Sequence, residues 1–181
     1  MTSEVLYTVL ILLVGLERVA ELVVTKRNEA WSMSRGGQEF GAKHYPPMVV
    51  LHTALLAGAL FEVWVRRPQI SVGFAVAMLA VLVGSQGLRW WCITTLGYRW
   101  NTRVIIVPGL APVTGGPYRF FSHPNYVAVV AEGIALPLIH GAWITALVFT
   151  VLNAWLLTVR IRCENKALAQ LPVPSTVPAG T

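Results

Sequence analysis

The chain has 181 residues, of which 55% are hydrophobic and only 12% are charged. About a quarter of the residues of a soluble domain are charged, so this composition excludes an ordinary water-soluble globule. The formal net charge of +6 fits the basic cytoplasmic loops of a membrane protein. We therefore expect contact with membrane lipids and no nucleic-acid partner.

The sequence lacks the usual metal-binding and dinucleotide-binding patterns. Its two cysteines, Cys92 and Cys163, are far apart and form no CxxC pair, and the four histidines show no metal-ligand spacing. No GxGxxG motif follows a predicted strand. We expect neither a metal site nor a Rossmann domain.

Three apolar blocks in residues 1–91 predict membrane-spanning helices at 5–24, 47–65 and 70–91. Each block is close to the ~20 residues that a helix needs to cross a bilayer. A polar segment, 25–45, separates the first two blocks and is expected to be a loop. The sequence therefore predicts an N-terminal part of three helices with one cytoplasmic loop.

Charged side chains interrupt the first of these predicted helices. Glu17, Arg18 and Glu21 lie within it, and Arg18 and Glu21 are three residues apart. These two can pair on one helix face, which lowers the cost of burying them in a membrane. The alternative is that all three lie at the inner interface and extend their charged groups into water.

Residues 92–171 are expected to form a second part, which begins with a long connector. The connector, 92–125, is rich in glycine, proline and arginine, and long segments without regular structure are usually functional. A helix is expected near 126–140. A further helix is expected at 143–159, and it continues as a polar helix over 160–171.

The tail, 172–181, is rich in Pro, Ser, Thr, Gly and Ala and is expected to be disordered. The whole pattern predicts an all-α integral membrane protein of about five transmembrane helices, in which the connector and the C-terminal helix form the functional site. If the N-terminus lies outside, the only basic residues on the outer side of the membrane are Arg66 and Arg67. The inner side then receives most basic residues, which predicts a cytoplasmic membrane protein with its site facing the cytoplasm: Lys26, Arg27, Arg35, Lys43, Arg89, Arg99, Arg103, Arg119, Arg160, Arg162 and Lys166.

The most informative segment of the connector is 116–126, with the sequence Gly-Pro-Tyr-Arg-Phe-Phe-Ser-His-Pro-Asn-Tyr. His123 precedes a proline, which favours an extended backbone and leaves its ring free to contact a ligand. The rings of Tyr118, His123 and Tyr126 suit a sulfonium cation through cation–π contact. The alternative is an interfacial aromatic belt followed by a helix that starts at Pro124.

A second polar group lies near the end of the last predicted helix. Arg160 and Glu164 are four residues apart and share one helix face. Together they can bind the carboxylate and the ammonium of a ligand that resembles an amino acid. The alternative is a solvated surface ion pair that contributes little to stability.

Taken together, these segments resemble the isoprenylcysteine carboxyl methyltransferase family of membrane proteins. The resemblance covers roughly 88–168, nearly half of the chain. Its motifs are Leu96-Gly97, Thr102-Arg103-Val104, Pro108-Gly109, Gly116-Pro117-Tyr118-Arg119, His123-Pro124-x-Tyr126 and Arg160-x-x-x-Glu164-x-x-x-Leu168.

The resemblance implies that S-adenosylmethionine (SAM) binds between the connector and the last helix. Arg160, Arg103 and Glu164 are the candidate catalytic residues. Two positions depart from the family pattern, because Ser122 replaces an arginine and Asn165 replaces a second glutamate. The residues that the resemblance assigns to the cofactor are Pro117, Tyr118, His123, Pro124, Tyr126, Glu164 and Asn165.

The N-terminal half resembles a bacterial branch of this family that is associated with type III polyketide synthases. The residues are 26–31, 39–46 and Leu51-His52. This resemblance implies O-methylation of the acidic hydroxyl of a long-chain alkylpyrone. Carboxyl methylation of an isoprenylcysteine is the alternative, and a small membrane transporter built around Glu132 is a more distant one.

Overall fold

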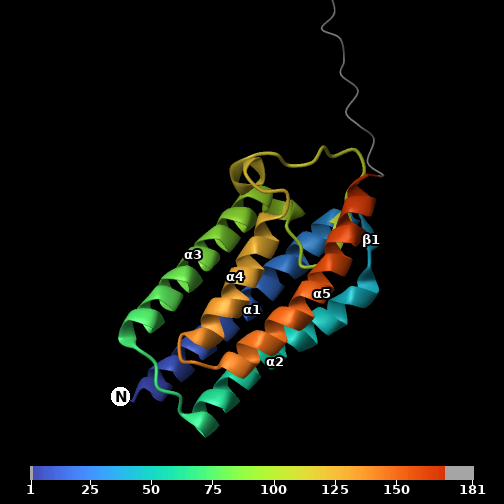
Figure 1. The fold of residues 1–181 in the computed structure, drawn as a ribbon. Helices are drawn as coiled ribbons and strands as arrows, with labels where there is room; N and C mark the ends of the chain where they lie inside the picture. Colours follow the sequence, from blue (N-terminus) through green and yellow to red (C-terminus); the bar gives the residue numbers. More distant parts are fainter. Residues whose placement is uncertain (1, 170–181) are drawn as a thin grey trace, which may run out of the picture.

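The computed structural model describes residues 2–169, and within them five long helices form a bundle (Figure 1). The tail predicted at 172–181 lies outside the described residues. The helices are α1 (Ser3–Met33), α2 (Tyr45–Arg66), α3 (Val72–Leu96), α4 (Pro124–Leu138) and α5 (Trp143–Leu168).

The predicted helical architecture and the number of helices are confirmed within the described residues, and three helices meet the requirements for a membrane span. These are α2 with the turn before it, α3 with the turn after it, and α5, which are long and apolar enough to cross a membrane. The 15 residues of α4 extend over about 22 Å, less than the ~30 Å of a hydrocarbon core. The 31-residue α1 carries charged residues in its middle.

The predicted loop at 25–45 is wrong for residues 25–33, because α1 continues to Met33. Three polar residues of this stretch, Thr25, Asn28 and Ser32, are buried, whereas Lys26 and Arg27 stay exposed. The side-chain amide of Asn28 donates hydrogen bonds to the backbone oxygens of Gly97 at 3.1 Å and Trp100 at 2.7 Å. Two extra helical turns therefore lie beside the connector and support it.

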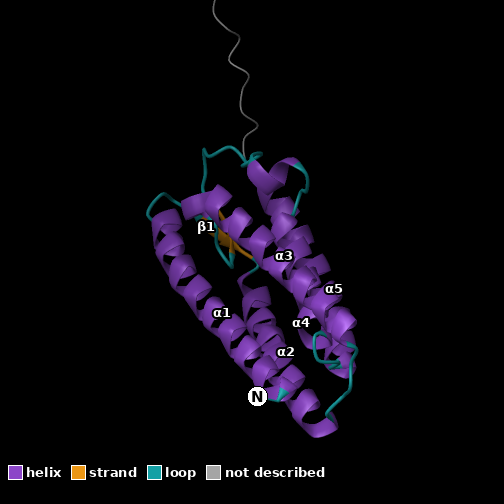
Figure 2. Ribbon diagram, turned by 90° about the vertical axis from the view of Figure 1, so that its left-hand side faces the viewer, coloured by secondary structure: helices purple, strands orange, loops and turns teal. Residues whose placement is uncertain are grey.

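A short antiparallel sheet also departs from the all-helical expectation. Strand β1 (Gln38–Phe40) pairs with β2 (Val104–Ile106), and Glu39 is opposite Ile105. The pairing ties the first loop to the connector, which begins only after α3 ends at Leu96 (Figure 2). Both segments therefore lie at the same end of the bundle, as the distribution of basic residues predicted.

Local sequence signals explain where the helices begin. Ser71 caps α3 by accepting a hydrogen bond from the backbone N–H of Phe74 at 3.3 Å. Prolines occupy the first turns of α2 and α4, where the missing N–H costs no helical hydrogen bond. In α4 this residue is Pro124, so the residue before it, His123, stays outside the helix.

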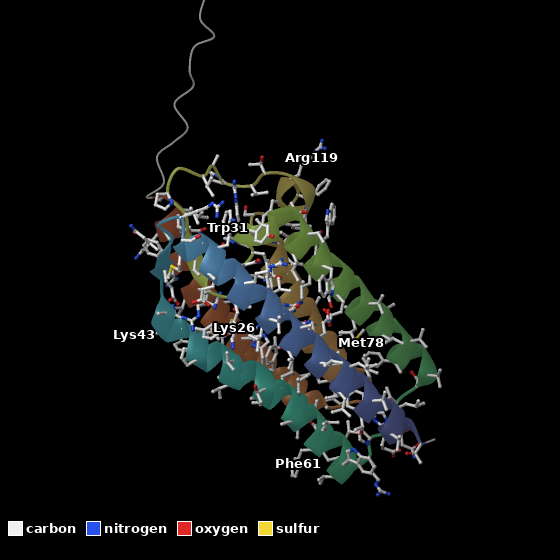
Figure 3. The ribbon with its side chains drawn as sticks, turned by 180° about the vertical axis from the view of Figure 1, so that it is seen from behind. Lys26, Trp31, Lys43, Phe61, Met78 and Arg119 are labelled. Carbon is white, nitrogen blue, oxygen red and sulfur yellow. The ribbon has the colours of Figure 1, made fainter. Side chains whose placement is uncertain are left out.

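The apolar core closes the bundle in the half away from the connector. The Tyr7 hydroxyl of α1 donates a 3.0 Å hydrogen bond to the backbone oxygen of Leu136 in α4. In Figure 3 Arg119 and Trp31 lie toward the connector end and Phe61 lies at the opposite end. The bundle is therefore packed at one end and open to a cavity at the other. The buried core residues are Tyr7, Ile11, Val14, Ala59, Val63, Leu82, Ala135, Leu136 and Ala142.

Candidate functional site

A cavity of about 540 Å³ lies beneath the connector, and all five helices contribute to its wall. Tyr118 and Trp100 of the connector line it, with Arg160 and Glu164 from α5. Apolar side chains of α1 and α2 line its other side. The volume is in the range of small-molecule sites, so the cavity is the candidate binding site.

The start of α4 and the end of α5 meet at this cavity. The Tyr126 hydroxyl donates a 2.6 Å hydrogen bond to Glu164, and the His123 ring lies 3.1 Å from the Asn165 side-chain oxygen. His123 Nδ1 is 3.8 Å from the Glu164 carboxylate. The His123 and Tyr126 rings stack with centroids 5.5 Å apart. Four of the predicted cofactor residues therefore form one group.

The sequence produces this group because Pro124 fixes the chain direction at the start of α4. His123 has φ −136° and ψ 64°, which is not helical, as expected for a residue before proline. Its ring therefore points away from the helix axis toward α5. Pro124 is almost fully buried and lines the cavity.

The other predicted cofactor residues lie in the turn Gly116–Arg119. Gly116 has φ +58°, and a Cβ there would collide with the Thr95 side chain, so the turn packs directly on α3. Tyr118 lines the cavity, and burial next to the Cys92 thiol raises the pKa of Tyr118. It therefore stays a protonated hydrogen-bond donor. Pro117 is buried behind the cavity wall and does not line it.

Arg160 joins α5 to the connector and faces the cavity. It is 6% exposed and donates a 2.8 Å hydrogen bond to the backbone oxygen of Thr102. Its other terminal nitrogen lies 3.1 Å from the Met48 sulfur, and its guanidinium is 6.0 Å from the Tyr126 ring centre. Its Nε has no partner among the described residues. A buried guanidinium with an unused donor can bind an anionic group.

The structure places Arg103 apart from this group. One terminal nitrogen contacts both carboxylate oxygens of Glu39 at 3.1 Å, and Glu29 lies 3.8 Å away. The guanidinium also stacks on the Tyr45 ring at 4.6 Å. Arg103 therefore fastens the connector to the first loop at the edge of the cavity.

Polar atoms without partners also lie in the wall of the cavity. The side-chain oxygens of Asn125 and Asn153 are buried and have no hydrogen bond within the described residues. Both residues line the cavity. Because unsatisfied buried polar groups are costly, such atoms indicate a site for water or a polar ligand.

A buried charge cluster lies at the interior end of the cavity, and the sequence predicted only one of its ion pairs. The predicted Arg18–Glu21 ion pair is present at 2.9 Å, but Arg89 pairs with Glu132 and lies 3.6 Å from Glu21. Arg18 also reaches Glu132 at 3.6 Å. Arg89 and Glu132 are single charges within the apolar helices α3 and α4, and the packing of these helices on α1 brings them to Arg18 and Glu21.

Comparisons with known proteins agree with the motifs at this site. The model of the isoprenylcysteine carboxyl methyltransferase (ICMT) family matches residues 75–170, which include α4, α5 and the connector. A Bacillus subtilis relative, Uncharacterized protein YpbQ, is 36% identical over 168 residues, which are 93% of this chain and 99% of the relative. An uncharacterized Haemophilus influenzae protein is 25% identical over 156 residues, which are 85% of this chain and 90% of that protein. The chain therefore belongs to the ICMT family, and its membership implies methyltransferase activity in a membrane.

Proposed function

We propose that the chain is a SAM-dependent O-methyltransferase that acts on a lipophilic substrate, with the acidic hydroxyl of a long-chain alkylpyrone or related polyketide as the methyl acceptor. The observation that carries the proposal is the meeting of α4 and α5 at the cavity. There the Tyr126 hydroxyl and the Glu164 carboxylate are 2.6 Å apart. An aromatic surface, a carboxylate and a guanidinium then surround one space.

The side chains at the cavity fit the groups of SAM. The Glu164 carboxylate suits an ammonium group, and the stacked His123 and Tyr126 rings suit a sulfonium. The unpartnered oxygen of Asn125 adds a buried acceptor, and Asn165 holds the His123 ring. When bound, SAM supplies an electrophilic methyl group.

Pro117, Tyr118 and Pro124 give this proposed site its shape. Both prolines are almost fully buried, so they hold the backbone on either side of Tyr118. Tyr118 lines the cavity together with Leu96 of α3. A rigid wall of this kind excludes water and positions the reacting groups, which can supply ~7–11 kcal/mol of the barrier reduction.

Arg160 is the residue that we expect to stabilise the acceptor oxygen before transfer. A hydroxypyrone enol is acidic enough to be largely ionised, so no strong general base is needed. The free Nε of Arg160 is buried in the cavity, where it can donate to an oxyanion. Because Glu39 and Glu29 already occupy Arg103, we assign Arg103 a positioning role: it holds the connector over the acceptor.

The cavity wall between α1 and α2 supports a lipophilic substrate. Val19 and Leu22 of α1 and Val49 of α2 line the cavity, and they are also 56%, 39% and 40% exposed at the bundle surface. In a membrane this surface faces the acyl chains of the lipids. We propose that the alkyl tail leaves the cavity between these two helices while the headgroup stays beneath the connector.

The positions of the site and of its partners follow from the same proposal. We place the connector end on the cytoplasmic side of the inner membrane, since it receives most of the basic residues. SAM would then enter from the cytoplasm. A functional link to a type III polyketide synthase would supply the alkylpyrone.

Methyl transfer by the purified protein tests the proposal. The full chain in detergent receives labelled SAM with a long-chain 4-hydroxy-6-alkyl-2-pyrone or with N-acetyl-S-farnesylcysteine. We expect label on the pyrone oxygen, and we expect Glu164→Gln to lose most of this activity. Label on the farnesylcysteine carboxylate alone would replace the pyrone with the alternative substrate. A protein that binds neither SAM nor its demethylated product would refute the proposal.

A further inference from the structure

The interior end of the cavity carries charges that the methyl-transfer proposal does not use. Glu21, Arg89 and Glu132 are 4%, 5% and 4% exposed, and they come from three different helices, α1, α3 and α4. Ionisable residues inside a membrane bundle are costly and mark functional sites. Since these three do not reach the group at Tyr126 and Glu164, they need a separate explanation.

Two of these residues combine burial with unused hydrogen-bonding capacity in the cavity wall. Arg89 Nε and Glu21 Oε1 are 3.6 Å apart, which is too long for a hydrogen bond, and neither has another partner within the described residues. Both residues line the cavity, together with Arg18. A free donor beside a free acceptor matches a group that both accepts and donates, such as a hydroxyl.

The charges of the cluster favour a neutral ligand group over an anion. Three carboxylates, those of Glu17, Glu21 and Glu132, surround the two guanidinium groups of Arg18 and Arg89. One terminal nitrogen of each arginine is already paired with one of these carboxylates at hydrogen-bond distance. A second oxyanion would therefore meet an excess of negative charge, whereas a hydroxyl would not.

The depth of the cluster fits a ring that carries two oxygens. Glu132 lies six residues after Tyr126 on α4, so it is about 9 Å deeper along the helix axis. A small ring spans such a distance when it makes one hydrogen bond at each end. One oxygen would lie near Arg160 at the cofactor end and the other near Glu21 and Arg89.

We infer that the interior end of the cavity is a second recognition site, which binds a neutral hydroxyl group on the substrate headgroup. The hydroxyl donates to Glu21 Oε1 and accepts from Arg89 Nε. Glu132 holds the Arg89 guanidinium in place from behind. The inference rests on the proposed function and extends it: among the lipophilic polyketides proposed as acceptors, a ring with two hydroxyls should bind more tightly than a ring with one, such as the 4-hydroxypyrone.

A matched pair of ligands and a matched pair of variants test this inference. The ligands are 5-pentadecylresorcinol, with two ring hydroxyls, and 3-pentadecylphenol, with one. The test variant is Glu21→Gln. Its amide oxygen can take the place of Oε2 and keep the hydrogen bond from Arg18. Its NH2 group then takes the place of the free acceptor Oε1, where it can only donate. The control is Glu17→Gln, which removes the same charge from the same cluster at a residue that does not line the cavity.

Binding is measured on the full chain in detergent, with S-adenosylhomocysteine affinity and thermal unfolding recorded for every variant. We expect the unmodified chain to bind the resorcinol about tenfold more tightly than the phenol. This is the loss of affinity expected when one buried hydrogen bond is not formed. Glu21→Gln is expected to abolish this preference, and Glu17→Gln is expected to keep it.

Two outcomes would overturn the inference. A third would refute the proposed function and leave the inference standing. Equal affinity of the unmodified chain for the two ligands would refute it, even if Glu21→Gln does not fold. Equal effects of the two variants on the preference would show that the cluster is only structural. A retained preference without any S-adenosylhomocysteine binding would support the hydroxyl site and refute the methyltransferase proposal.

Discussion

The Tyr126 hydroxyl donates a 2.6 Å hydrogen bond to Glu164, and this contact joins the first turn of α4 to the last turns of α5. The two residues are 38 positions apart in sequence. Their contact closes one side of the cavity and fixes the Glu164 carboxylate beside the His123 ring. The affinity for a charged methyl donor should therefore depend on this pair.

Glu164→Gln should weaken the binding of S-adenosylhomocysteine by about tenfold, because it removes the charge opposite the proposed ammonium group. Tyr126→Phe should have a smaller effect, since the carboxylate stays. Isothermal titration calorimetry on the purified chain measures both. Lys166→Ala is the control, because this exposed residue lies on the same helix outside the cavity. Unchanged affinity in Glu164→Gln would contradict the assignment of this carboxylate.

Arg160→Gln should lower kcat by about 10²-fold, as expected when a donor to a charged acceptor is removed. The affinity for S-adenosylhomocysteine should change less than kcat, because Arg160 bonds to Thr102 and Met48 and lies 6.0 Å from the Tyr126 ring centre. Single-turnover methyl transfer and calorimetry separate the two quantities. Arg162→Gln, at an exposed position two residues later, should leave both unchanged. A loss confined to cofactor affinity would show that Arg160 binds the cofactor instead.

The helices were predictable from sequence because each depends on a local run of apolar residues. The end of α1 was not, since Asn28 and Ser32 look like loop residues until Asn28 meets the backbone of Gly97 and Trp100. Strands of three residues give too little alternation to detect. The His123–Glu164 group was predictable only through the family motifs. Residue spacing does not predict a contact between two segments that are about 40 residues apart.

Glu62 stabilises the start of α5, a role that no local pattern in the sequence indicated. Its carboxylate accepts hydrogen bonds from the backbone N–H groups of Ile144 at 3.1 Å and Thr145 at 2.8 Å, and from the Thr145 hydroxyl. It thus caps α5 from another helix, α2. Glu62→Ala leaves these donors without a partner and should cost about 1–3 kcal/mol of stability.

Thermal unfolding of the Glu62 variants in detergent measures this cap. Glu62→Gln keeps an acceptor oxygen at the same position, so it should lose less stability than Glu62→Ala. S-adenosylhomocysteine affinity should stay unchanged in both, because Glu62 does not line the cavity. Equal stability of the alanine variant and the unmodified chain would show that solvent replaces the cap without cost.

Gly133 sets the distance between α4 and α5, because a Cβ at this position would collide with the Phe149 ring. Gly133→Ala should therefore destabilise the bundle by about 1–3 kcal/mol through overpacking. It should also weaken cofactor binding, since the same two helices carry Tyr126 and Glu164. Adding Phe149→Leu should restore part of both losses.

Gly84→Ala is the matched control: that glycine on α3 has open space at its Cβ, so alanine should stabilise the helix by up to ~1 kcal/mol. If Gly133→Ala and Gly84→Ala shifted the unfolding temperature equally, close packing of α4 on α5 would not be what positions the site.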